Sequence, residues 1–197
     1  MNNIIELKNI SKVFDNQKKV TVLRNLNFKF KKGKVYSLSG PSGSGKSTLL
    51  NLLSIIDRPS SGNIKIDNEN INYNKIENND KIRSNNIGIV YQEKNLLPDF
   101  TALENICLAS LAVDNNPKIA EQESLEIIQK VGLKDRADHF PSELSGGELQ
   151  RIAISRAIVN KPRILLADEP TGSLDHENAN QIFNLLFKLK NKDRVII

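Results

Sequence analysis

The residue types at positions 40–48, with the sequence GPSGSGKST, suit the binding of a nucleotide phosphate. The segment fits the pattern GxxxxGK[ST], in which glycines let backbone N–H groups point at phosphate oxygens and a following helix adds its N-terminal dipole. Lys46 is expected to contact the β- and γ-phosphates, and Ser47 to place its hydroxyl on Mg²⁺. A chance glycine-rich turn is disfavoured, because an apolar run precedes the segment and helical apolar spacing follows it. The residues expected to contact ATP here are Gly40, Pro41, Ser42, Gly43, Ser44, Gly45, Lys46, Ser47 and Thr48.

A second chemical feature is a pair of carboxylates at the end of an apolar run, ILLADEP at residues 164–170. Asp168 is expected to hold the Mg²⁺ through water, and Glu169 to polarise the attacking water as a general base. Adjacent side chains on an extended backbone point to opposite faces, so the two carboxylates can serve different purposes. A solvated strand end is the alternative, and the phosphate loop upstream makes it less probable.

The composition is that of an ordinary globular domain. The 197 residues are 39% hydrophobic and 26% charged, with a formal net charge of +5, and they suffice for one domain with a subdomain. No apolar run approaches the roughly 18 residues that a membrane span needs, and the N-terminus has no secretory pattern. The single cysteine, Cys107, excludes an internal disulfide and favours a reducing compartment. Because the lysines are dispersed among acidic residues, the charge favours a solvated surface over nucleic-acid binding.

The elements that must position these residues alternate between strands and helices. Leu26, Phe28 and Phe30 alternate with polar residues, which is typical of a half-buried strand. Thr101 and Glu104 fit a capping box at a helix start. Strands are expected at residues 4–10, 20–30, 35–39, 64–67, 87–91, 163–167 and 195–197. Helices are expected from residue 46 and over 101–111, 117–132, 145–160 and 178–189, and residues 68–86 are expected to be irregular with some helix.

The segment LSGGE lies between the phosphate loop and the acidic strand end, and it resembles the signature sequence of ATP-binding cassette (ABC) proteins. It comprises Leu144, Ser145, Gly146, Gly147 and Glu148. Residues 4–197 resemble the ATP-binding subunits of ABC transporters. The resemblance implies an α/β fold with a P-loop NTPase (RecA-like) core, an N-terminal antiparallel β subdomain and a helical subdomain carrying the signature. One ABC ATPase domain over 1–197 is expected, with the core at 1–91 and 161–197 and the helical subdomain at 92–160.

The resemblance also implies roles for individual residues. Gln92 matches the Q-loop glutamine, which couples Mg²⁺ and water to the membrane partner. Phe14 matches the aromatic residue that stacks on adenine, although a core phenylalanine is an open alternative. The signature residues of one subunit contact the γ-phosphate held by the other, so a homodimer is implied. The D-loop that crosses the dimer interface matches Ser173, Leu174 and Asp175.

Three further segments, 95–105, 136–143 and 178–183, resemble the lipoprotein-releasing ATPases of bacterial inner membranes. Macrolide-exporter-type and cell-division ATPases are the nearest alternatives. Glu93 and Lys94 depart from the family pattern, which leaves the details of the partner groove open. The resemblance implies integral membrane permease partners, an indirect action on lipoprotein cargo, no nucleic acid, and a position at the cytoplasmic face of the inner membrane.

The switch histidine of the family, which follows the strand beginning near residue 195, is absent from the sequence. His139 and His176 are the only histidines, and neither is in register with that position. We therefore expect a chain truncated at its C-terminal side that binds ATP and hydrolyses it poorly. One rival is a truncated binding module without hydrolysis. Another is a soluble ABC protein acting on DNA or ribosomes, which is disfavoured because residues 49–143 are too few for a coiled-coil insertion and only one cassette is present.

Overall fold

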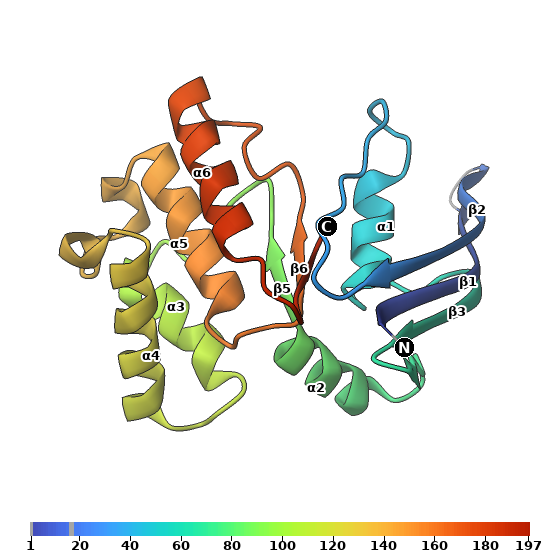
Figure 1. The fold of residues 1–197 in the computed structure, drawn as a ribbon, viewed down its shortest axis with the longest axis horizontal. Coiled ribbons are helices and arrows are strands. Elements are labelled where there is room, and N and C mark those ends of the chain that lie inside the picture. The colour runs from blue at the N-terminus through green and yellow to red at the C-terminus, as the bar shows by residue number, and fades with distance from the viewer. Residues whose placement is uncertain (1, 16–17) are drawn as a thin grey trace.

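The computed structural model describes residues 2–15 and 18–197. One of its two sheets is antiparallel and has four strands in the order β2-β1-β3-β4. These strands are β1 (Asn3–Asp15), β2 (Lys19–Lys31), β3 (Ser61–Ile66) and β4 (Glu69–Asn70). This sheet lies at one end of the molecule, with helix α1 (Lys46–Leu53) packed beside it (Figure 1). The antiparallel N-terminal sheet expected from the sequence is therefore present.

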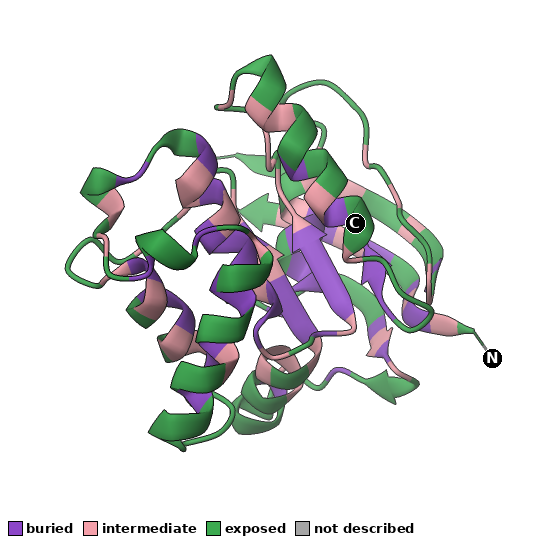
Figure 2. Cartoon of the chain, turned by 60° about the vertical axis from the view of Figure 1, so that its left-hand side comes forward, coloured by how far each residue is buried: buried purple, intermediate pink, exposed green. Residues whose placement is uncertain are grey.

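The second sheet is parallel and occupies the middle of the molecule (Figure 1). Its order is β5-β6-β7, formed by β5 (Ile87–Val90), β6 (Ile164–Ala167) and β7 (Val195–Ile196). Leu165 belongs to the apolar cluster on the helical side, whereas Ile164 and Leu166 belong to the cluster shared with the antiparallel sheet. The alternation of side chains along β6 thus joins the two halves of the core, and these parallel strands are buried (Figure 2).

The strand expected at residues 35–39 is reduced to one bridge, between Val35 and Ile196. The N–H of Tyr36 also donates to the Ile196 carbonyl at 2.8 Å. The N–H groups of Val195 and Ile197 bond on the other side, to the carbonyls of Arg163 and Leu165, so β7 offers only Ile196 to this segment. The run therefore lies along the sheet without forming a regular strand.

The remaining helices lie on the far side of the parallel sheet, apart from α2 at its edge (Figure 1). They are α2 (Ile76–Asn86), α3 (Ala102–Leu111), α4 (Pro117–Lys130), α5 (Gly146–Ile158) and α6 (His176–Lys188), with 3₁₀ turns at η1 (Lys134–Arg136) and η2 (Pro141–Glu143). The capping box that the sequence predicts at Thr101 and Glu104 is present. Helix α6 begins two residues earlier than expected, because the carboxylate of Asp175 caps it.

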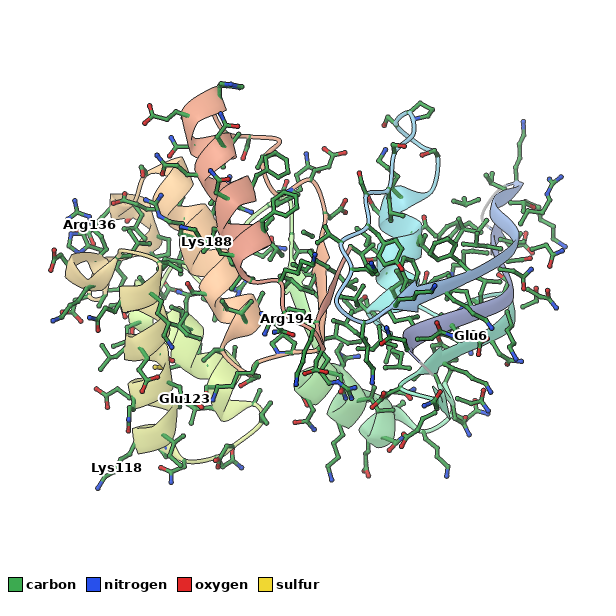
Figure 3. The ribbon with its side chains drawn as sticks, viewed as in Figure 1. Glu6, Lys118, Glu123, Arg136, Lys188 and Arg194 are labelled. Carbon is green, nitrogen blue, oxygen red and sulfur yellow. The ribbon has the colours of Figure 1, made fainter. Side chains whose placement is uncertain are left out.

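Buried Arg194 holds the end of α6 to the parallel sheet. Its Nε donates to the carbonyl of Pro162 at 2.7 Å, and its Nη1 donates to the carbonyl of Leu189 at 3.0 Å. The side chain lies between α6 and the strands (Figure 3). Burial lowers the pKa of Arg194, since the charged guanidinium loses solvation. The two carbonyl partners supply the hydrogen bonds that a buried charge requires, and they fix where β7 begins.

Candidate functional site

The glycine-rich loop leads directly into α1, as the sequence predicts. Gly43 and Gly45 have φ angles of 78° and 92°, in the left-handed region that favours glycine. A Cβ at Gly45 would lie 2.9 Å from Cγ1 of Val22 on β2, so the close approach also requires glycine. The Nζ of Lys46 donates to the carbonyl of Gly40 at 2.9 Å and to that of Pro41 at 3.1 Å. The loop thus folds around a positive charge at the N-terminus of a helix, an arrangement suited to phosphate.

The two carboxylates follow β6 at the edge where the loop also lies. The N–H of Asp168 donates to the carbonyl of Val90 at 2.9 Å, which extends the parallel ladder by one residue. Glu169 has a φ of 44°, and its carbonyl accepts from the N–H of Gly172 at 3.0 Å. The extended backbone that we expected at Glu169 is therefore wrong, because the chain turns there. A left-handed conformation at a non-glycine residue costs about 1–3 kcal/mol and is commonest at functional sites.

One cavity of about 440 Å³ brings the lysine and both carboxylates together. Lys46, Asp168 and Glu169 line it alongside residues 35–38 and two exposed aromatic side chains of α6, Phe183 and Phe187. Of the expected phosphate-contacting residues 40–48, Lys46 alone lines this cavity, where it meets the acidic strand end.

The donors near this cavity fit Mg²⁺ in the form in which it accompanies nucleotide phosphates. Mg²⁺ keeps several waters and takes only one or two protein oxygens besides the phosphates. Ser47 presents an exposed hydroxyl at the start of α1, and Asp168 presents a partly exposed carboxylate. Within residues 2–15 and 18–197, no group of three or more His, Cys, Asp or Glu side chains could hold a metal by itself. The residues present thus fit an ion shared with substrate.

Gln92 is exposed two residues after the end of β5, and two side-chain contacts hold the segment that follows it. Arg156 of α5 donates from Nη1 to the Asn95 carbonyl at 2.7 Å and from Nη2 to the Lys94 carbonyl at 2.8 Å. Nζ of Lys94 donates to Oγ of Ser173 at 2.6 Å. Burial lowers the pKa of Arg156. The sequence analysis missed Arg156; Lys94 had stood out only as a departure from the family pattern.

The signature segment forms the start of α5 through a capping box that the sequence analysis did not identify. Ser145 is the N-cap, and its N–H donates to Oε2 of Glu148 at 2.8 Å while the N–H of Glu148 donates to Oγ of Ser145 at 3.3 Å. Nε of Arg136, at the outer edge of the helical part (Figure 3), lies 3.1 Å from Oε1 of Glu148. These bonds lower the pKa of Glu148 to about 2. The largest effect comes from the Ser145 backbone N–H, followed by the Ser145 hydroxyl and then by Arg136. The S-x-x-E spacing was the signal that could have revealed this cap.

The residues matched to the D-loop connect the cavity to α6. Ser173 is exposed and accepts from Lys94, and Asp175 caps α6 by accepting from the N–H of Asn178 at 3.0 Å. Leu174 lies 3.5 Å from where a Cβ on Gly146 would stand. The D-loop of one chain therefore packs against the signature segment of the same chain.

Phe14 lies on β1 opposite Val20 of β2 and is 39% exposed. That exposure excludes the alternative of a core phenylalanine. The ammonium of Lys12 stands 4.9 Å from the ring centroid and also bonds to Asp57 at 2.7 Å. The aromatic ring of Phe14 is thus exposed on the antiparallel sheet, and strand β2 of the same sheet contacts the phosphate loop.

The signature residues do not line the cavity that holds Lys46. Nor do Gln92 and Phe14, or His139 and exposed His176. A single chain thus brings Lys46 together with the two carboxylates, and the LSGGE segment lies outside that cavity.

A comparison with protein families matches residues 23–172 to the ABC transporter family model. The chain belongs to the ABC transporter family. The ABC ATPase fold is confirmed by the dimeric ATP-binding cassette MJ0796 bound to ADP and Pi, which is 38% identical with a TM-score of 0.89 over 98% of this chain and 86% of that one. The cassette cbiO1 from Clostridium perfringens is 26% identical, with a TM-score of 0.86, and the match covers 100% of this chain and 78% of that one.

Two sequence relatives of this ABC ATPase carry the same name. The "Lipoprotein-releasing system ATP-binding protein LolD" of Ehrlichia canis is 42% identical over 100% of this chain and 88% of its own length. The protein of the same name from Idiomarina loihiensis is 43% identical over 94% of this chain and 82% of its own length. Membership of the family, together with the neighbour in a post-hydrolysis state, supports ATP hydrolysis as the enzymatic class. No helix among the described residues is long and apolar enough to cross a membrane.

Proposed function

We propose that this ABC ATPase drives the release of lipoproteins from a bacterial inner membrane, as the ATP-binding subunit of a transport complex. The observation that carries the proposal is that relatives named for a lipoprotein-releasing system match the chain from end to end, at 42% identity in the Ehrlichia canis protein. The resemblance at residues 95–105, which follow the Q-loop glutamine, supports the same subfamily.

Within one subunit, residues 1–91 and 161–197 form the nucleotide-binding core in this proposal, and residues 92–160 form the helical subdomain. The backbone of residues 40–48 wraps the phosphates, Lys46 neutralises the β- and γ-oxygens, and exposed Phe14 stacks on adenine. The ammonium of Lys46, which now bonds to two loop carbonyls, exchanges those partners for phosphate oxygens.

Mg²⁺ would be held by Ser47 and Gln92 directly and by Asp168 through water, and when bound it neutralises charge on the phosphate oxygens. Glu169 accepts a proton from the attacking water as general base. The presence of Lys46 and Glu169 in the same cavity supports this role. The left-handed backbone at Glu169 also supports this role, because such conformations cluster at functional sites.

Two copies are needed to complete a site. Gly146 and Gly147 stand in the first turn of α5, where N–H groups without a partner inside the helix attract anions, yet neither they nor Ser145 line the cavity that holds Lys46. In the proposed homodimer, these residues, with Leu144 and Glu148 supporting them, close over the γ-phosphate of the other copy. The D-loop at residues 173–175 lies across that interface.

The membrane partner would be a pair of integral permease subunits, with this chain at the cytoplasmic face. Leu97, Phe100 and Phe140 are exposed beside α3 and offer an apolar surface for them. The Glu93–Lys94 departure lies next to this surface and would adapt it to the particular permease.

Affinity purification of the tagged chain from detergent-solubilised membranes of its own host tests the proposal. We expect permease subunits encoded with lipoprotein-release genes to co-purify, and Leu97→Asp to abolish their recovery while leaving nucleotide binding intact. Recovery of a macrolide exporter or a cell-division membrane protein instead would overturn the lipoprotein assignment.

A further inference from the structure

Gly147 of the signature segment packs directly against Asn178 of α6. Gly147 is buried, and a Cβ at its position would stand 2.4 Å from Oδ1 of Asn178 and 2.9 Å from its Cγ. Real Cβ atoms essentially never approach a neighbour so closely, so no larger residue fits there without displacing Asn178. Gly147 is the second residue of α5, and Asn178 is the third residue of α6. The two residues therefore lie in van der Waals contact because position 147 is a glycine.

Asn178 is itself held in place by the D-loop. Its Nδ2 donates to Oδ2 of Asp175 at 2.5 Å, and its backbone N–H donates to Oδ1 of the same carboxylate at 3.0 Å. Both oxygens of Asp175 are thus engaged by one residue. Rotation of the Asn178 side chain away from Gly147 would break the first of these bonds.

A second contact lies one turn further along the same pair of helices. Nη1 of Arg151 on α5 donates to Oε1 of Gln181 on α6 at 3.0 Å. Together with the packing of Leu174 near Gly146, this contact makes the signature segment and the D-loop one continuous unit within a subunit.

We propose that Asn178 is a positioning residue that sets the signature segment against the D-loop, so that both meet the other subunit in register. The proposal rests on the function proposed above, in which both segments face the second copy. Asn178 does not touch the nucleotide; it acts through Gly147 on one side and Asp175 on the other. Its loss should weaken closure of the dimer and leave binding of ATP to the monomer unchanged.

The first test compares Asn178→Ala with Asn180→Ala, since Asn180 is an exposed asparagine on the same helix. Both are made in a Glu169→Gln chain, and ATP-dependent dimerisation is measured by sedimentation, with a fluorescent ATP analogue reporting nucleotide binding. We expect Asn178→Ala to weaken dimerisation about five- to tenfold, as for the loss of a hydrogen bond, with analogue affinity unchanged. Asn180→Ala should match its parent.

Asn178→Asp provides a second variant that keeps the shape of the side chain against Gly147. It replaces the N–H donor with a second carboxylate facing Asp175, so we expect dimerisation to weaken at least as much. Dimerisation of both Asn178 variants equal to that of the parent would overturn the inference and leave the proposed function standing. If the Glu169→Gln parent neither binds ATP nor dimerises, both this inference and the proposed function are wrong.

A double-mutant cycle on thermal stability tests the packing contact itself. Gly147→Ala should lower the unfolding midpoint, and Asn178→Ala in the same chain should restore part of the loss, because the remaining Cβ of Asn178 stands 3.5 Å away. If the changes in unfolding midpoint caused by the two substitutions are strictly additive, the side chains at 147 and 178 do not interact, and the proposal is overturned.

Discussion

The guanidinium of Arg156 donates to two successive carbonyls, those of Lys94 and Asn95, at 2.8 and 2.7 Å. Arg156 stands on the helix that the signature segment begins, whereas the two carbonyls belong to the segment that follows Gln92. The segment proposed to contact a membrane partner is therefore tied to the helix proposed to contact the second ATP. The planar guanidinium presents one terminal nitrogen to each carbonyl in a fixed geometry, which a flexible lysine side chain would not hold as rigidly.

Replacing Arg156 with alanine should destabilise the chain by about 1–3 kcal/mol, because the carbonyls of Lys94 and Asn95 lose charged donors. Denaturant unfolding monitored by circular dichroism measures the difference. Arg24→Ala removes an exposed arginine on β2 and is the matched control, with an expected change below about 0.5 kcal/mol. Equal stability of the Arg156 and Arg24 variants would show that the two carbonyls are satisfied without the guanidinium.

Glu148→Gln should lower stability at neutral pH by about 0.5–2 kcal/mol, because the carboxylate completes the cap of α5 and binds Arg136. The folded state lowers the pKa of Glu148 from 4.5 to about 2, so between those values the unfolded state binds more protons. The contribution is therefore complete above pH 4.5 and disappears as the pH falls toward 2. Unfolding curves at a series of pH values should show the gap between wild type and Glu148→Gln closing over that window.

Glu121→Gln, at an exposed carboxylate on α4, is the control for this pH series. It should leave the pH dependence of the wild-type chain unchanged. A gap between wild type and Glu148→Gln that stays constant with pH would contradict the assignment of the lowered pKa to the cap.

Asp67 joins the antiparallel sheet to the parallel one. Arg163, which precedes β6, reaches its carboxylate with both terminal nitrogens, and Lys32 lies 3.4 Å from it. Hydrogen bonding from Arg163, ahead of the effect of Lys32, lowers the pKa of Asp67. Asp67→Asn preserves a side chain suited to the φ of 48° there and removes the charge. We expect a loss of about 0.5–1 kcal/mol, since the pair is partly exposed.

Salt distinguishes this electrostatic contribution from packing. The difference between wild type and Asp67→Asn should shrink when unfolding is repeated near 1 M salt, where the Debye length is about 3 Å. An unchanged difference would mean that the amide disturbs packing rather than charge.

Much of this arrangement could be predicted from local patterns, and the rest depends on contacts that are distant in the sequence. The glycine spacing before Lys46 and the apolar run before Asp168 each dictate their own local structure, and both lie where expected. The strand predicted at residues 35–39 is reduced to a single bridge, because β7 offers only one residue, Ile196, for pairing with it. The contact of Gly147 with Asn178 has no local signature, since either residue alone is compatible with many neighbours.

Lys46→Ala should weaken nucleotide binding at least about a hundredfold, because it removes a charge-assisted contact to the phosphates and the two bonds from Nζ to the loop carbonyls. Isothermal titration with Mg²⁺-ATP measures the affinity. Lys75→Ala, outside the cavity and just before α2, serves as a control and should bind as the parent does. Retention of full affinity by Lys46→Ala would place the nucleotide elsewhere.

The claim that the ATP site is shared between two copies is tested most directly by mixing two defective chains that both carry Glu169→Gln. One has Lys46→Ala and cannot hold the phosphates; the other has Ser145→Arg and blocks its own signature segment. Neither should dimerise alone with ATP, but their mixture contains one complete site, formed by the phosphate loop of the second chain and the LSGGE segment of the first. Sedimentation of the mixture should show an ATP-dependent heterodimer. A mixture that remains monomeric, when the Glu169→Gln parent dimerises, would contradict the shared site.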